Sequence, residues 1–171
     1  MRTIRTKVYK FSELSKEGKE QAIDNLRDIN VDYSWWDFTY EDASNIGLKI
    51  TSFDLDRNRH AKGEFLLSSN EVAANILKEH GENCKTYKTA EKFLEEWTPL
   101  FADYMNEESD NYEDDNDLMV CEEEFLKSLC EDYSIMLQNE MEYLMTDEAI
   151  IETIEANDYE FYANGNVYET I

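Results

Sequence analysis

The acidic residues of this chain are concentrated in its second half. Residues 93–171 contain 24 Asp and Glu residues and a single basic residue, Lys127, whereas residues 1–92 contain 16 acidic and 15 basic residues. The second half therefore carries nearly all of the formal net charge of −24. Charged side chains are almost never fully buried unless they are paired, so a folded chain must place most of these carboxylates on its surface.

Enough apolar material remains between the acids to build a core. Hydrophobic residues make up 42% of the 171 residues, and aromatic residues make up 13%. This content is too high for a disordered chain, despite the charge. The N-terminal segment has no apolar signal region and no run is long enough to span a membrane, so we expect a cytoplasmic protein.

Alternating apolar and polar residues predict short strands. The segments concerned are 3–11, 48–56, 61–67 and two short stretches on either side of Asn164-Gly165. Residues 57–60 would join two of these strands into a hairpin, and Asn-Gly is the strongest hairpin signal in the chain. Because the last hairpin lies at the C-terminus, we expect the chain to return to the N-terminal sheet.

Helical spacing of apolar residues accounts for most of the remainder. One predicted helix follows Ser15, and two more cover 34–46 and 70–80. A fourth begins at Thr89, with a kink or an interruption at Pro99. The last two run from Leu118 to Leu144 and follow Thr146. Residues 105–117 are read as an acidic loop or a frayed helix end. The fold class is therefore α+β, with a small, mostly antiparallel sheet of about five strands and five or six helices. Residues 1–171 would form a single domain, within which residues 89–156 could form an acidic helical subdomain.

Few residues suggest catalysis. The chain has two histidines, His60 and His80, and neither lies next to a nucleophile motif. No glycine-rich phosphate loop and no C-x-x-C pair occurs, so we predict no catalytic residues, no metal site and no cofactor. We expect the three cysteines to be reduced.

The acidic stretch is the best candidate for a binding surface. Its negative charge far exceeds the ~2–8 units that keep a small domain soluble, and a field of one sign steers a basic partner toward the protein. Basic surfaces in cells are commonly built to hold nucleic acid, so we expect a basic nucleic-acid-binding protein as partner, and neither nucleic acid nor an anionic membrane. The predicted contact residues are Glu107, Glu108, Asp110, Glu113, Asp114, Asp115, Asp117, Glu122, Glu123 and Glu124. Trp35, one of two adjacent tryptophans, is the predicted exposed apolar anchor. In the alternative function, a regulatory or antitoxin-like adaptor would bind its partner through such an anchor and would not imitate nucleic acid.

Parts of the sequence resemble a family of small acidic proteins from bacterial phages and mobile elements. The resemblance covers roughly residues 7–66 and the last 25 residues, and it is carried by Lys7-Val8-Tyr9-Lys10-Phe11, Asp32-Tyr33-Ser34-Trp35-Trp36, Phe53-Asp54-Leu55-Asp56-Arg57 and Tyr159-Glu160-Phe161. Small acidic phage proteins include anti-defence proteins, among them anti-CRISPR inhibitors of Cas9. The resemblance thus implies a phage-encoded inhibitor acting in the bacterial host cytosol, where a DNA-like acidic surface would block a defence nuclease such as Cas9. It carries over no catalytic residue.

Overall fold

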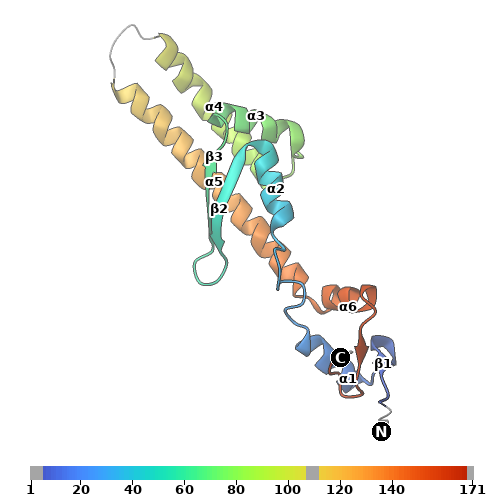
Figure 1. The fold of residues 1–171 in the computed structure, drawn as a ribbon. Coiled ribbons are helices and arrows are strands. Elements are labelled where there is room, and N and C mark those ends of the chain that lie inside the picture. Colours follow the sequence, from blue (N-terminus) through green and yellow to red (C-terminus); the bar gives the residue numbers. More distant parts are fainter. Residues whose placement is uncertain (1–5, 107–111, 169–171) are drawn as a thin grey trace. The chain divides into compact units, whose positions relative to one another are not determined.

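The computed structural model describes residues 6–106 and 112–168, and these residues are mainly helical. Among them the chain forms six α-helices, one short 3₁₀ helix and four strands (Figure 1). The four strands form two separate two-stranded antiparallel sheets. The predicted sheet of about five strands is therefore wrong, and the fold is a mostly helical α+β fold.

The first predicted strand is much shorter than expected. Within the described part of 3–11 only β1 (Tyr9–Lys10) is a strand, and Phe11–Glu13 form a turn of 3₁₀ helix. The backbone N–H of Lys10 donates a hydrogen bond to the carboxylate of Glu13 at 2.9 Å. This local cap competes with continued strand pairing, and an alternating pattern of side chains does not reveal it.

The chain divides into two compact units, which are described separately. The first consists of Met1–Trp35 with Asn139–Ile171, and the second of Trp36–Gln138. In the first unit, β1 pairs antiparallel with β4 (Glu160–Phe161), which confirms that the C-terminal segment returns to the N-terminal strand. Helices α1 (Lys16–Asn25) and α6 (Asp147–Ala156) complete the unit around Phe11, Ala22, Ile150, Ile154 and Phe161.

The predicted Asn164-Gly165 turn is present in the first unit. Gly165 has φ +84°, and a Cβ atom added to it would lie 2.3 Å from the carbonyl oxygen of Gly18. The Tyr162 N–H donates to the Asn166 carbonyl at 2.8 Å, and Phe161 forms a single bridge with Val167. The second arm of the hairpin is thus one bridged residue rather than a strand, and the tight turn lies directly against α1.

The second unit contains the remaining elements and has its own core. They are α2 (Asp37–Ile46), β2 (Leu48–Asp54), β3 (His60–Phe65), α3 (Ser69–Glu79), α4 (Lys85–Asn106) and α5 (Tyr112–Leu144) as far as Gln138. The predicted hairpin is confirmed, because Leu48 pairs with Phe65 and Asp54 with His60. None of the helices in the described residues is both long and apolar enough to traverse a lipid bilayer.

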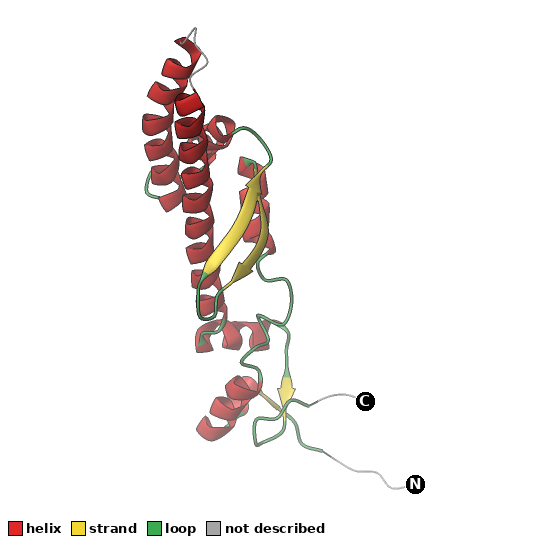
Figure 2. Cartoon of the chain, turned by 90° about the vertical axis from the view of Figure 1, so that its left-hand side faces the viewer, coloured by secondary structure: helices red, strands yellow, loops and turns green. Residues whose placement is uncertain are grey.

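Two features of the long helices differ from the prediction. The predicted interruption at Pro99 is wrong, because α4 continues unbroken through Pro99 to Asn106. Of the segment 105–117, read as an acidic loop or a frayed helix end, the described residues 105–106 belong to α4 and 112–117 to α5, which begins six residues before the expected start. Residues 107–111 lie outside the described residues. Helices α4 and α5 lie side by side over much of α4 (Figures 1 and 2).

Candidate functional site

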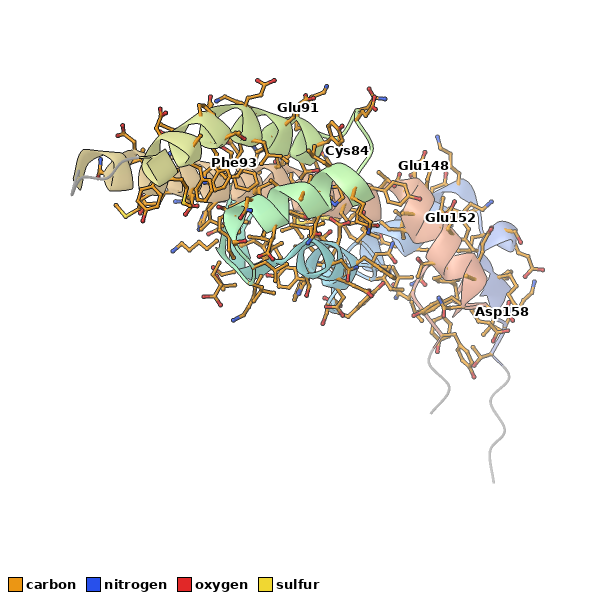
Figure 3. All side chains as sticks on the ribbon, turned by 90° about the horizontal axis from the view of Figure 1, so that it is seen from above. Cys84, Glu91, Phe93, Glu148, Glu152 and Asp158 are labelled. Carbon is orange, nitrogen blue, oxygen red and sulfur yellow. The ribbon has the colours of Figure 1, made fainter. Side chains whose placement is uncertain are left out.

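Helices α4 and α5 run antiparallel, and three contacts fix their register. The rings of Phe93 and Phe125 stack with centroids 4.0 Å apart. On one side of this pair the Thr89 hydroxyl donates to Asp132 at 2.7 Å, and on the other the Trp97 indole N–H donates to Glu122 at 3.2 Å. Figure 3 labels Phe93 and Glu91 on α4, with Glu91 at the outer edge of the helix.

Carboxylates from both helices meet on one side of this pair. A cavity of about 90 Å³ lies between the helices, and both Glu96 of α4 and Glu124 of α5 line it. Seven residues are nearly two full turns of helix, so Asp103 follows Glu96 on the same side of α4. By the same spacing, Asp117 and Glu131 share the side of α5 that carries Glu124. We refer to these residues as the acidic face: Glu96, Asp103, Asp117, Glu124 and Glu131.

The acidic face is exposed, and basic residues lie beside it. Lys92 lines the same cavity as Glu96 and Glu124. Lys127, one turn of α5 from both Glu124 and Glu131, lines a second pocket with Glu131, Arg59 and Lys62. All five side chains are exposed to solvent. Within the described residues only Glu96 has a basic partner within 4 Å, namely Lys92 at 3.5 Å. The field of the face acts on the nearby thiol of Cys121, whose pKa is raised first by burial and then by Glu96, Glu122 and Glu124.

The density of charge on this face can be compared with that of nucleic acid. Successive carboxylates on one helix are separated by about 10.5 Å, because each residue rises about 1.5 Å. The α5 row therefore extends over about 21 Å, and the five carboxylates amount to about one charge per 4 Å of that length. A single DNA strand has about one charge per 3.4 Å and the duplex one per 1.7 Å. The face thus approaches the linear charge density of one strand, not of a duplex.

Nine of the ten predicted acidic contact residues divide into three groups, and the tenth, Glu122, is described below. Glu107, Glu108 and Asp110 lie outside the described residues. Glu113, Asp114 and Asp115 belong to the first turn of α5, and their side chains are not described. Asp117, Glu123 and Glu124 are exposed on α5. Sequence reasoning did not select Glu96, Asp103 and Glu131, although the repeated spacing of seven residues was a signal that could have found them.

Glu122 has a structural role that the sequence did not indicate. It is half-buried, and its Oε1 atom accepts hydrogen bonds from the Ser69 hydroxyl at 2.7 Å and from the Trp97 indole. These two donors come from α3 and α4, so Glu122 joins three helices of the second unit. Its carboxylate is therefore engaged within the fold, unlike its neighbours Glu123 and Glu124.

Trp35 is not the exposed anchor that the sequence predicted. Its side chain is 9% exposed, and the adjacent Trp36 is half-buried with its ring 5.4 Å from that of Phe53. Helix α2 begins only at Asp37, so both tryptophans lie in the preceding turn. The helical spacing that placed them on opposite sides does not apply there. The exposed aromatic side chains of this segment are Tyr33 and Phe38, the latter on α2.

One group of polar side chains in the second unit includes a histidine. Tyr133 donates to Asp42 at 2.8 Å, His80 Nδ1 lies 2.7 Å from the Thr86 hydroxyl, and His80 Nε2 lies 3.6 Å from the other Asp42 oxygen. The nearby His80 ring and the hydrogen bond from Tyr133 lower the pKa of Asp42, while burial raises that of Tyr133. Tyr133 therefore stays protonated and acts as a donor that holds α5 against α2. Within the described residues no group of three or more His, Cys, Asp or Glu side chains could hold a metal ion.

Asp132 is a buried carboxylate whose charge is expected to reduce stability. Burial raises its pKa more than the Thr89 hydrogen bond lowers it. A raised carboxyl pKa means that the folded state binds the proton more tightly, so stability is lost as the pH rises from about 4 through the folded-state pKa. Replacing Asp132 with Asn removes this cost while retaining an acceptor for Thr89. The free energy of unfolding at pH 7 should rise by about 1 kcal/mol.

Urea denaturation at pH 7 and pH 4 tests this expectation. The gain should shrink toward pH 4, where the wild-type carboxyl becomes protonated and resembles the amide. Exposed Glu140, replaced with Gln, is the control for the loss of one charge on α5 and should change the free energy of unfolding by less than about 0.5 kcal/mol. A clear loss of stability in Asp132→Asn at pH 7 would show that the ionised form is the favoured one.

Comparison with known proteins returns no match. No protein-family model, no curated protein and no solved structure matches the chain. The function is therefore argued from the side chains and their arrangement.

Proposed function

We propose that this protein is an anti-defence inhibitor, encoded by a phage, that binds a basic nucleic-acid-binding protein of the bacterial host through its acidic face. The observation that carries the proposal is the acidic face itself, where two packed helices direct carboxylates to one side. Arg and Lys side chains that bind phosphates also form strong hydrogen bonds with carboxylates. A rigid pair of helices can therefore occupy a groove that normally holds a nucleic acid strand.

A defence nuclease such as Cas9 has the required kind of surface. Its channel for the guide–target heteroduplex is positively charged, and arginines read the short motif beside the target. The carboxylates of the acidic face approach the charge density of one strand, so blocking a single-strand path or part of the channel suits the face better than replacing a whole duplex. An inhibitor of this kind acts in the host cytosol and needs no catalytic residue, cofactor or metal.

The adaptor alternative needs an exposed apolar or aromatic anchor, for which Trp35 was the predicted example. Because Trp35 is buried, that form of the alternative has lost the residue on which it was based. The burial of Trp35 does not bear on the acidic face, which contains no aromatic residue.

Salt dependence and competition by DNA test the proposed function. The tagged protein is immobilised and exposed to a lysate of bacteria that produce a Cas9–guide RNA complex. We expect retention of a nucleic-acid-binding protein that duplex or single-stranded DNA releases, and its affinity should fall at least about tenfold between 50 and 300 mM NaCl. Bound proteins that neither DNA nor salt releases would contradict imitation of nucleic acid.

A further inference from the structure

The α4–α5 pair also carries an apolar surface. On α4, Trp97, Phe101 and Tyr104 follow at helical spacing, with the rings of Trp97 and Phe101 stacked at 4.5 Å and those of Phe101 and Tyr104 6.4 Å apart. Phe101 and Tyr104 are exposed, and Met105 beside them is 66% exposed. Large apolar side chains that are exposed together, rather than singly, mark a surface for binding another molecule.

Helix α5 adds one residue to this surface. The register set by Phe93 against Phe125 and Trp97 against Glu122 places Phe101 opposite residues 117 and 118, so Met119 occupies the next position on α5. Met119 is 53% exposed. We call Trp97, Phe101, Tyr104, Met105 and Met119 the apolar patch. Phe101 is about 140° around α4 from Glu96, so the patch and the acidic face occupy different sides of the helix pair.

The apolar patch begins where the cover provided by α3 ends. Val72 and Ile76 of α3 pack in one core cluster with Ala90 and Phe93 of α4. The first residue of α3, Ser69, donates to Glu122, and Trp97 donates to the same carboxylate oxygen. Beyond this point α4 and α5 continue past α3 (Figure 1). The patch therefore continues the surface of α4 and α5 on which α3 packs, at a position that α3 does not reach.

Charge decides what kind of helix fits this position. Asp103 precedes Tyr104, and Glu123 lies one turn of α5 from Met119, so acids border the patch. A second copy of the chain would bring another formal charge of −24 to the same place. We propose that the apolar patch binds an amphipathic helix of a partner protein, with an apolar stripe bordered by Lys and Arg, which continues the path of α3 over α4 and α5. This proposal does not rest on the proposed function, because its anchoring residues are apolar and none of them belongs to the acidic face, although Asp103 lies at the border of both surfaces.

Model peptides test the proposal on the full-length protein. The probe is an 18-residue peptide of Leu and Lys patterned as an amphipathic helix. The comparison peptides have the same composition in scrambled order, or the same pattern with Glu in place of Lys. The variant Met105→Ser/Met119→Ser removes two well-exposed side chains, so its fold should be retained. The control Phe38→Ser/Met136→Ser removes two exposed apolar side chains elsewhere in the second unit.

We expect the Leu/Lys helix to bind the wild type at least tenfold more tightly than the scrambled peptide and to gain helicity. The Met105→Ser/Met119→Ser variant should bind it at least fivefold more weakly than wild type, and the control variant within twofold. Equal binding of the scrambled peptide, or of the Leu/Glu helix, would overturn the proposal, as would a patch variant that binds like wild type. A wild-type dimer in light scattering that the patch variant abolishes would assign the patch to a second copy and also overturn it.

Discussion

Replacing Phe125 with Ala should lower the free energy of unfolding by about 3–5 kcal/mol. Phe125 is 3% exposed, its ring stacks on Phe93, and it lies 5.6 Å from the ring of Phe65 on β3. Truncation would remove the contact that joins α5 to both α4 and the hairpin. It would leave a cavity between helices that cannot close without shifting the register of the acidic face.

Urea denaturation followed by circular dichroism measures this effect. The matched control is Phe38→Ala, which truncates an aromatic side chain that is 83% exposed in the same unit and should cost less than about 0.5 kcal/mol. A loss below about 1 kcal/mol for Phe125→Ala would mean that the stacked ring pair does not hold the two helices together.

Features set by neighbouring residues could be predicted from the sequence. Gly47 ends α2 in the left-handed conformation, with φ +93°, directly after the predicted helix over 34–46. Thr146 caps α6 by accepting a hydrogen bond from the Ala149 N–H. The β2–β3 hairpin was also predicted, because its strands are close in sequence and a polar turn joins them. In each case the signal and the structure lie within a few residues of one another.

Features that depend on tertiary contacts could not be predicted in this way. Pro99 removes one backbone donor from α4, yet the helix continues, with the Thr98 hydroxyl donating to the Leu94 carbonyl and the rings of Trp97 and Phe101 stacked across the same turn. Packing of this kind outweighs the intrinsic cost of one proline, which is about 3 kcal/mol. The sequence pattern contains the proline but not the contacts that compensate for it.

The candidate site also combines a feature that the sequence predicts with one that depends on tertiary contacts. The spacing of Asp117, Glu124 and Glu131 by seven residues is visible in the sequence and places them on one side of a helix. Which side of α4 lies next to these three carboxylates depends on the stacking of Phe93 on Phe125. Composition and spacing do not reveal this contact. For this reason sequence reasoning selected the densest acidic run, whereas the structure groups carboxylates that are more widely spaced in the chain.

Neutralising the acidic face should weaken binding of a Cas9–guide RNA complex by more than tenfold at 100 mM NaCl. The variant is Asp117→Asn/Glu124→Gln/Glu131→Gln, which changes three exposed side chains that have no basic partner within 4 Å among the described residues. Each lost carboxylate removes a charge-assisted contact with Arg or Lys, and a weaker dependence of affinity on salt should accompany the loss.

The control for net charge is Glu140→Gln/Glu152→Gln/Glu155→Gln. These three exposed residues of α5 and α6 belong to the first unit, and their replacement removes the same formal charge. The most direct measurement is the equilibrium dissociation constant of both variants and wild type for the Cas9–guide RNA complex. We predict a loss of more than tenfold for the acidic-face variant and less than threefold for the control. Equal losses in the two variants, or no loss in either, would contradict an acidic face that binds where nucleic acid binds.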